Sequence, residues 1–351
     1  MKYRPDAIDS PWMGPERVTW LQQVQAWLEI AAQPLELGTP VSLTVVKERP
    51  WAAVLHARFQ NGAAYSKAPG PLGRTEAGLL HWLQAPGPDA RLAPRLLASR
   101  ADTGWMLLAD AGSPLRGWPV PDDRLRVLAS TLARYASAQR RSLHELPALR
   151  ALGLPELALT ELPLRLDALS KDPSFRAAFD PDAANAMEEQ LHALLPELRA
   201  RVASLARRPW STALEHGDLH VGNILVEGTC HALCDWGDAG LTHPAVSLGR
   251  ALPVMLQSLP EPRQADALDT LLAAWSKAWD EPGDMAAELP LVLWLSHAVR
   301  ALSYAQVFAA AEPAHRAAWM PFAGQALTSF IRSKDAFLDG ELLDALRLPL
   351  A

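Results

Sequence analysis

Two aspartates and an asparagine in the segment 214–248 have side chains that could serve one reaction centre. Asp218 and Asn223 lie five residues apart in a stretch that reads as a loop. Asp235 follows twelve residues after Asn223, beyond a hairpin-like stretch whose turn lies near Glu227-Gly228, so a hairpin would return it to the neighbourhood of Asn223. Mg²⁺ takes one or two such oxygen ligands from a protein. The segment therefore predicts a phosphoryl-transfer centre, where an aspartate orients the attacking hydroxyl.

Two motifs in this segment resemble those of a known superfamily. HGDLHVGNIL is similar to the catalytic loop of the aminoglycoside phosphotransferases and choline kinases, with the pattern H-x-D-x-x-x-x-N, and CDWGDAG resembles their metal-binding loop. The resemblance implies that Asp218 is the catalytic base and that His216 braces the loop. It also implies that Asn223 and Asp235 bind Mg²⁺, that the nucleotide is ATP or GTP, and that the acceptor is a hydroxyl of a small molecule.

The N-terminal part fits the same resemblance. In kinase-like folds a lysine on the third strand contacts the phosphates and pairs with a glutamate on the next helix. Lys67 and Glu76 stand at these places, and Arg74-Thr75-Glu76-Ala77 resembles the family's helix start. GWMLLAD resembles the strand that leads to the hinge, which implies that a purine is held by the backbone near Leu108, Ala109 and Asp110.

The elements that must position these residues can be read from the sequence patterns. Residues 16–31 have apolar positions at helical spacing, beginning with Val18. Three strand-like runs follow within 41–68, the first two joined by a glycine-free turn at 47–50 and the last two by Asn61-Gly62, whose residues accept a positive φ. A short helix from about residue 75 and two more strands, at 94–100 and 104–110, complete a small α+β domain.

Beyond residue 110 helical patterns dominate. We expect a long helix over 122–147, then short helices broken at prolines, strands and loops over 211–240, and helices again from 244. The breaking prolines are Pro155, Pro163, Pro173 and Pro196. The predicted fold class is α+β, a bilobal protein-kinase-like fold with an N-lobe at 1–110 and a helical C-lobe at 111–351.

One stretch departs from the superfamily pattern. The family often continues as G-D-P-x-x-D-L after the metal loop, whereas this chain has Thr242-His243-Pro244-Ala245-Val246-Ser247-Leu248. Both acidic positions are lost, to His243 and Ser247, and in the family the second aspartate usually braces the catalytic loop. The main prediction is an ATP-dependent phosphotransferase. The alternative is a catalytically impaired pseudokinase or a nucleotide-binding regulator.

A zinc site is a rival interpretation of the same segment. It contains His216, His220, Cys230, His231 and Cys234, which are all zinc-ligand types. Cysteines four residues apart on a strand lie ~13 Å from each other, too far for one Zn²⁺ with bonds of ~2.3 Å. Buried thiols in a strand are the simpler interpretation.

Three further features keep two interpretations each. Asp238 is a third metal or substrate contact, or a turn residue. A helical stripe lines a substrate cleft or packs in the core; it contains Trp294, His297, Arg300 and Tyr304. An acidic group serves a cationic acceptor or forms a solvated loop; it contains Asp280, Glu281, Asp284 and Glu288.

The composition limits the classes of protein. Apolar residues make up 49% of the 351 residues, so the chain can bury a core. The net charge is −6 without a basic stripe, which argues against nucleic-acid binding. Two cysteines form no disulfide framework, the N-terminus lacks a signal-peptide core, and apolar runs such as Leu289–Leu295 fall short of the ~20 residues of a membrane span. We therefore expect a cytoplasmic protein without a membrane segment, whose oligomeric state the sequence does not determine.

Overall fold

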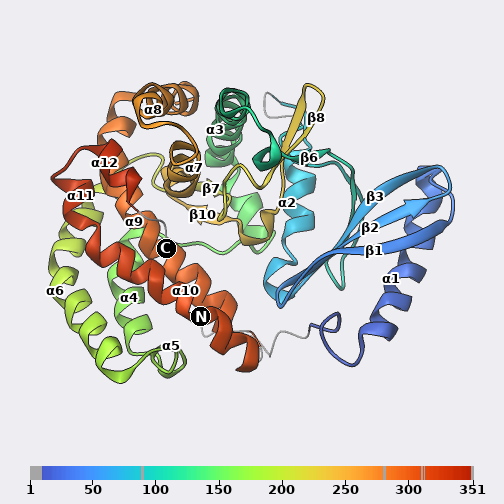
Figure 1. Cartoon of the computed structure of the whole chain (residues 1–351), viewed down its shortest axis with the longest axis horizontal. Helices are drawn as coiled ribbons and strands as arrows, with labels where there is room; N and C mark the ends of the chain where they lie inside the picture. Colours follow the sequence, from blue (N-terminus) through green and yellow to red (C-terminus); the bar gives the residue numbers. More distant parts are fainter. Residues whose placement is uncertain (1–9, 88–90, 280–281, 310, 312, 349–351) are drawn as a thin grey trace.

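The computed structural model describes residues 10–87, 91–279, 282–309, 311 and 313–348. An antiparallel sheet lies at one end of the molecule, and a larger helical region lies at the other (Figure 1). This arrangement confirms the α+β class and the two-part fold that the sequence predicts. The last strand of the sheet ends at Ala109, and the boundary between lobes at residue 110 stays a prediction.

Five antiparallel strands form the N-terminal sheet, in the order β1-β2-β3-β5-β4. Their bounds are β1 (Pro40–Arg49), β2 (Ala52–Phe59), β3 (Gly62–Pro69), β4 (Leu96–Arg100) and β5 (Trp105–Ala109).

Both predicted turns differ from the expectation in detail. The hairpin at Asn61-Gly62 exists, but its turn is Gln60-Asn61, because Gly62 already pairs with Phe59. Gln60, Asn61 and Gly62 all have a negative φ. The predicted turn at 47–50 is wrong, because β1 continues to Arg49 through a bulge between Val45 and Lys47. The chain turns at Pro50-Trp51 instead.

Helix α1 (Arg17–Ala32) covers the outer face of the sheet (Figure 1). Alternate residues of β2 point toward this helix, since successive side chains of a strand lie on opposite faces. The small core between them contains Trp20, Val24, Leu28, Leu55 and Ala57. Val18, which the sequence pattern places on the apolar face, is 67% exposed, because the buried stripe begins at Trp20.

Helix α2 (Glu76–Leu83) lies on the other face of the sheet, between the sheet and the helical region (Figure 1). Leu79, Leu80 and Leu83 are buried in the main core together with Met106 of β5. The neighbouring residue Leu107 belongs to the α1 core, so the two faces of the sheet bury separate cores.

The helical region contains the predicted long helix, which is α3 (Pro121–Ala151) with a kink at Glu145. The other α-helices are α4 (Leu162–Ser170), α5 (Pro173–Arg176), α6 (Pro181–Leu205), α7 (Leu248–Leu256), α8 (Glu261–Ser276), α9 (Pro282–Ala309), α10 (Pro313–Arg332), α11 (Lys334–Leu338) and α12 (Leu342–Arg347).

Prolines begin some of these helices but do not break all of them. Pro163 and Pro173 lie in the first turns of α4 and α5, where a missing N–H costs nothing. Pro196 lies inside α6, so the expected break there is wrong. The buried face of α6, which includes Leu191, Leu195 and Leu198, offsets the lost hydrogen bond through apolar burial.

Short strands interrupt the helices, as predicted for residues 211–240. β7 (Ala213–Glu215) pairs with β10 (Gly240–Thr242), and β8 (Ile224–Glu227) pairs with β9 (Cys230–Leu233) and with β6 (Ser113–Pro114). The turn of the β8–β9 hairpin contains Gly228, close to the predicted place.

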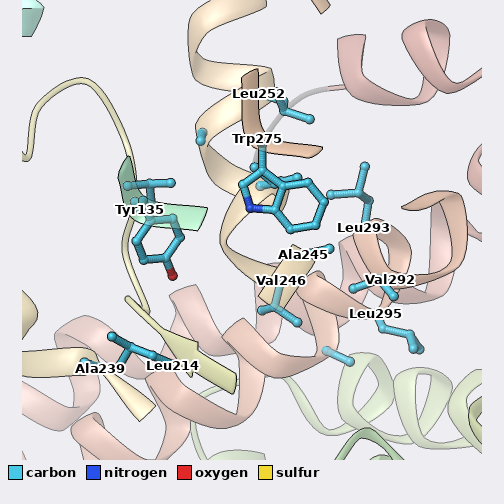
Figure 2. Packing of buried hydrophobic residues seen from close by; sticks show 14 of the residues in the cluster. Tyr135, Leu214, Ala239, Ala245, Val246, Leu252, Trp275, Val292, Leu293 and Leu295 are labelled. Carbon is cyan, nitrogen blue, oxygen red and sulfur yellow. The ribbon is translucent and has the colours of Figure 1, made fainter. Parts of the chain in front are cut away.

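The main core lies between α3, α7, α8 and α9, where Tyr135, Leu252, Trp275 and Leu293 pack together (Figure 2). Residues Gly283–Ala309 of α9 have the length and apolarity of a membrane span, with a mean hydropathy of 1.2. The most apolar window of this helix is 61% buried inside the fold. A buried core helix of a soluble protein has the same composition, so α9 alone is weak evidence for a membrane span.

Candidate active site

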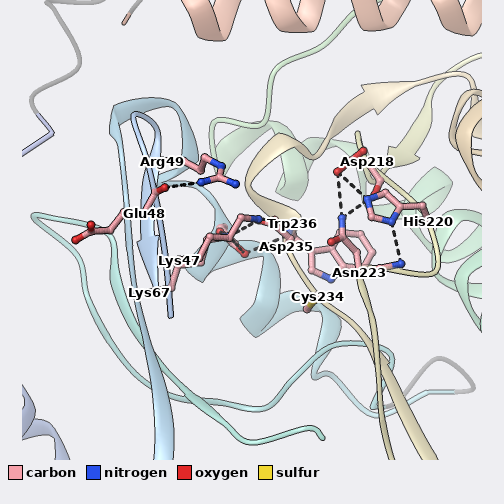
Figure 3. Close-up of polar contacts among 12 residues, drawn as sticks. Lys47, Glu48, Arg49, Lys67, Asp218, His220, Asn223, Cys234, Asp235 and Trp236 are labelled. Atoms are coloured by element: carbon pink, nitrogen blue, oxygen red, sulfur yellow. Dashed lines mark hydrogen bonds and ion pairs between the residues drawn. The ribbon is translucent and has the colours of Figure 1, made fainter. Parts of the chain in front are cut away.

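The predicted catalytic segment forms two adjoining loops. The first loop follows β7, and Gly217 in this loop has a φ of +86°. A Cβ at Gly217 would lie 2.3 Å from the carbonyl oxygen of Asp238, so only glycine fits this close approach. The second loop follows β9, and the Cys234 N–H donates to the Asn223 carbonyl at 2.8 Å. This bond sets Asn223 beside Asp235, as the hairpin prediction required (Figure 3).

Lys67 joins the sheet to the second loop. Its ammonium donates to Glu76 Oε1 at 2.9 Å and to Asp235 Oδ1 at 2.7 Å, and only 6% of the residue is exposed. Burial alone would lower the pKa of Lys67, but the charges of Asp235 and Glu76 raise it well above its ordinary value. The predicted Lys67–Glu76 pair is therefore present. Lys67 also forms an ion pair with Asp235 (Figure 3).

Asp235 has an unusual backbone, with φ +65° and ψ +58°. A non-glycine residue in the left-handed region is uncommon and persists where the surrounding contacts fix it. Lys47 contributes a second ammonium 3.5 Å from Asp235 Oδ2. The charge of Lys67 chiefly, and that of Lys47, hold the pKa of Asp235 well below its usual range.

Three side chains contact the Asp218 carboxylate. Arg250 forms an ion pair, with Nε 2.7 Å from Oδ1. His220 Nε2 lies 3.3 Å from Oδ2, and Asn223 Nδ2 donates to Oδ2 at 3.2 Å (Figure 3). Partial burial would raise the pKa of Asp218, but the bond from His220 and the charge of Arg250 lower it to about 2. A carboxylate has about four lone-pair sites, so Asp218 can still accept a hydrogen bond from a substrate hydroxyl.

His216 bridges the two loops from a fully buried position. Its Nε2–H donates to the Cys234 carbonyl at 3.0 Å, and its Nδ1 accepts from the Asp218 N–H at 3.2 Å. Burial lowers the pKa of His216 to about 4, so the ring is neutral and these two bonds fix its tautomer. These contacts are the bracing that the sequence predicts for His216.

Behind the loop, a chain of hydrogen bonds ends on a buried carboxylate. The His216 N–H donates to the Tyr135 hydroxyl at 2.9 Å, the Tyr135 and Ser247 hydroxyls lie 2.6 Å apart, and Ser247 Oγ donates to Glu215 Oε1 at 2.7 Å. Burial raises the pKa of Glu215, and the bonds from Ser247 and the Gly217 N–H lower it. Ser247 therefore stands beside a carboxylate supplied by β7.

The other departure from the family pattern also has an acid beside it. His243 is fully buried, and its Nε2 lies 3.5 Å from Glu288 of α9. Glu288 also forms an ion pair with Arg208 and accepts from Trp210 at 3.1 Å. The same Arg208 lies 2.6 Å from Asp284. Glu288 and Asp284 thus serve these contacts, and Asp280 and Glu281 lie outside the described residues.

A cavity of about 320 Å³ joins the two regions and contains the reactive groups. Lys47, Lys67, Asp218, Asp235 and Asp238 all line it. Desolvation of the Asp238 carboxyl, together with the charges of Asp235 and Asp218, raises its pKa to about 7.

The three predicted hinge residues lie at the end of β5 and just beyond it. The Ala109 N–H donates to the Arg95 carbonyl at 2.9 Å, and Leu108 pairs with Tyr65. Asp110 Oδ1 accepts from the Gly112 N–H at 2.9 Å. The contact of these three residues with a purine stays a prediction. The Ala109 N–H is already hydrogen-bonded to Arg95, so it is not available to a purine.

The zinc ligand types do not gather into a site. Within the described ranges, no group of three or more His, Cys, Asp and Glu residues is placed to hold a metal ion. Cys230 is exposed, and burial raises the pKa of the Cys234 thiol to about 12, which keeps it protonated.

The helical stripe on α9 divides between two roles. Trp294 is buried and stacks on Phe330 with ring centroids 4.5 Å apart, so it is a core residue. Arg300 is 9% exposed, and His297 lines a separate cavity of about 270 Å³. Tyr304 lines the cavity with Asp218.

This arrangement of a Lys–Glu pair on a sheet and helix, facing an H-x-D loop in a helical region, defines a kinase of the protein-kinase-like fold. The chain belongs to the phosphotransferase enzyme family, whose sequence profile matches residues 64–287. No curated protein sequence matches it.

Solved structures share the fold at low identity. A macrolide 2′-phosphotransferase from Brachybacterium faecium is 21% identical, with a TM-score of 0.50 over 86% of this chain and 98% of that chain. A choline kinase from Cryptosporidium parvum is 12% identical, with a TM-score of 0.59 over 91% and 96%. An amicoumacin kinase in complex with AMP-PNP, Ca²⁺ and amicoumacin is 12% identical, with a TM-score of 0.55 over 90% and 96%.

Four residues of this site were not predicted from the sequence. They are Lys47, Tyr135, Glu215 and Arg250. Arg250 stands three residues after Ser247, one helical turn along α7, which is a signal that the sequence offered. Glu215 directly precedes His216 in the chain, and only its contact with Ser247 depends on the packing. Lys47 and Tyr135 come from β1 and α3, and only strand pairing and helix packing bring them to the loops.

Proposed function

We propose that the protein is an ATP-dependent kinase that phosphorylates a hydroxyl of a small molecule. The observation that carries the proposal is the 2.7 Å contact between Lys67 and Asp235, in the cavity that Asp218 also lines. Phosphoryl transfer needs little covalent help from the protein. It needs a cation on the phosphates, ligands for a metal, and a group that orients the hydroxyl.

The residues present fit a divalent cation. Desolvation raises the pKa of Asp238, and the charges of the neighbouring Asp235 and Asp218 raise it further. Three carboxylates thus lie together on this side of the cavity, where a cation would relieve their repulsion. Asn223 uses its Nδ2 to donate to Asp218, which leaves its amide oxygen as the group that could bind a metal. Asp235 and Asn223 would hold Mg²⁺. A bound Mg²⁺ neutralises part of the negative charge of the phosphates.

The side chains of the protein have separate tasks in this mechanism. Lys67, held by Glu76, binds phosphate oxygens. Asp218 accepts a hydrogen bond from the acceptor hydroxyl and aims its oxygen at the phosphorus. The hydroxyl forms a bond to the γ-phosphorus while the bond to the ADP oxygen breaks, and the proton passes through Asp218 to solvent. A base with a pKa of about 2 is weak, so its main contribution is orientation.

The alternative of an impaired pseudokinase rests on the acids lost at His243 and Ser247. Glu215 provides a carboxylate 2.7 Å from Ser247, and Glu288 lies 3.5 Å from His243. The contact of Glu215 with Ser247 continues through Tyr135 to the His216 N–H, which counts against a loosened catalytic loop and supports an active kinase.

The test combines nucleotide binding with ATP hydrolysis in the absence of an acceptor. MgAMP-PNP binding should persist in Asp218→Asn and be lost in Asp235→Asn, since only the second residue holds the metal. The rate of MgATP hydrolysis should fall by about 100-fold or more in Asp218→Asn. Asp269→Asn, at an exposed position on α8, is the matched control and should change neither. Unaltered hydrolysis by Asp218→Asn would remove the assignment of the base.

A further inference from the structure

One wall of the cavity consists of aromatic rings from both regions of the molecule. Trp51 comes from the turn between β1 and β2, Tyr304 and Phe308 from α9, and Trp319 and Phe322 from α10. These five side chains are called the aromatic wall here. Ring centroids are 5.0 Å apart for Trp51–Trp319, 5.8 Å for Trp51–Phe308 and 5.6 Å for Trp319–Phe322, so the wall is continuous.

Four of the five side chains of the aromatic wall keep apolar surface exposed, and Phe308 is the buried exception at 4%. Phe322 is 41% exposed, and Trp51, Tyr304 and Trp319 are partly exposed, whereas most large apolar side chains of the fold are buried. Val307 adds an aliphatic side chain to the same wall. Ligand sites are typically apolar cavities with a few directed polar groups, and here Asp218 is the directed group in the same cavity.

The carboxylates of the cavity lie among the phosphoryl-transfer groups, and no residue of the aromatic wall is acidic. Among the described lining residues the carboxylates are Glu76, Asp218, Asp235 and Asp238. Glu76 and Asp235 are paired with Lys67, and Asp218 is paired with Arg250. The fourth, Asp238, lies beside Asp235 and Asp218, on the side of the cavity where Mg²⁺ would bind.

Two arginines, in contrast, already lie beside the aromatic wall. The Arg49 guanidinium lies 6.0 Å from the centre of the Trp319 ring, and Arg250 Nη1 lies 3.5 Å from the Tyr304 hydroxyl. At this distance the Arg49 guanidinium is at the outer limit of a cation–π contact with Trp319. A cationic acceptor would meet the like charge of Arg49 at the aromatic wall, whereas Arg250 is paired with Asp218.

We infer that the acceptor has an apolar ring-bearing body without a cationic group, and that it binds on the aromatic wall with its hydroxyl directed at Asp218. This inference rests on the proposed kinase function and names the acceptor class of the same site. The reaction is balanced by transfer of the γ-phosphoryl group from ATP to the acceptor oxygen, with ADP leaving and the hydroxyl proton released.

Binding of three probes by calorimetry, with and without MgAMP-PNP, tests this. The probes are naphthylethanol, which is neutral and aromatic, choline, which is a quaternary ammonium, and kanamycin, which is a polycation. Naphthylethanol should bind the wild-type protein, and neither cation should bind or compete with it. No binding of naphthylethanol, or tighter binding of choline or kanamycin, would overturn the inference.

Variants assign the binding to the aromatic wall. Phe322→Ala and Trp319→Ala should each weaken naphthylethanol about tenfold, because each removes a ring contact. Trp27→Ala is the matched control, since Trp27 packs on Trp105 outside the cavity, and it should have no effect. Phe322→Glu keeps an exposed position and adds a carboxylate, so it should abolish naphthylethanol binding and introduce binding of choline. Equal naphthylethanol affinity in the wild type and Phe322→Glu contradicts the assignment.

The two proposals fail in different ways. Binding of MgAMP-PNP without binding of naphthylethanol would refute the acceptor class and leave the kinase function intact. Failure of MgAMP-PNP to bind would refute the kinase function, and the acceptor assignment to a kinase would fall with it.

Discussion

Ser247 Oγ donates a hydrogen bond to the Glu215 carboxylate at 2.7 Å. The carboxylate behind the catalytic loop is therefore supplied by β7, the strand that precedes this loop. It reaches the catalytic loop through Ser247 and Tyr135 to the His216 N–H and directly to the Gly217 N–H. We interpret Glu215 as a positioning residue that acts on Asp218 through the loop.

Glu215→Gln tests this interpretation. The buried hydrogen-bond chain loses its charged acceptor, so the free energy of unfolding should fall by about 1–3 kcal/mol. In steady-state MgATP hydrolysis, kcat should fall about tenfold while KM for MgATP stays unchanged, because Lys67 and Asp235 are not in this chain. The double variant Glu215→Gln/Ser247→Asp restores a carboxylate beside the loop and should recover most of kcat. A purely structural role would lower stability without this rescue.

Gly217→Ala should distort the catalytic loop. A Cβ there would lie 2.3 Å from the Asp238 carbonyl at a φ of +86°, so both sterics and backbone strain oppose it. We expect a loss of about 2–4 kcal/mol in the free energy of unfolding, measured by urea denaturation, and a large drop in MgATP hydrolysis. Gly117→Ala is the matched control, because no heavy atom lies within 4 Å of its Cβ. Similar losses in both variants would show that the close approach is unimportant.

Lys47→Met should weaken nucleotide binding moderately. Its ammonium is 3.5 Å from Asp235, but the side chain is 49% exposed, so solvent screens the interaction. KM for MgATP should rise about fivefold with little change in kcat. Lys67→Met, at a buried position between two carboxylates, should instead lower kcat by about 100-fold or more. Lys277→Met, exposed at the end of α8, is the control, and an unchanged KM in Lys47→Met would remove Lys47 from the phosphate site.

Stability should depend on pH through buried neutral histidines. Burial lowers the pKa of His297 to about 4, against about 6.5 in the unfolded chain. Between these values the unfolded chain binds a proton that the folded chain does not, so the free energy of unfolding rises with pH. As the pH falls from 6.5 to 4, protonation of His297 in the unfolded chain lowers the free energy of unfolding by about 3 kcal/mol.

The matched variant for this prediction is His297→Gln, which cannot titrate. Urea denaturation at pH 7, 6 and 5 should give a shallower dependence in the variant by up to about 1.4 kcal/mol per pH unit. His216, whose pKa is also about 4, contributes to the pH dependence of stability in both the wild type and the variant. Parallel curves for the two proteins would contradict a buried neutral His297.

The sequence by itself determined the parts of the site that are contiguous in the chain. Asp218 and Asn223 lie in one short loop, and a hairpin returns the chain to Asp235, so their spacing already fixed their neighbourhood. Lys67 and Glu76 are nine residues apart, at the end of a strand and the start of the next helix, and their ion pair was predictable for the same reason.

Only the tertiary structure decided which distant residues join that site. Strand alternation would place Lys47 on the same face as Val45, toward α1. The bulge between them shifts the register, so that Lys47 pairs with Val54 and shares the cavity face with Lys67. The contacts of Glu215 with Ser247, of Arg250 with Asp218, and within the aromatic wall likewise join separate elements. Local spacing fixes geometry within one segment, whereas contacts between segments depend on register and packing across the whole core.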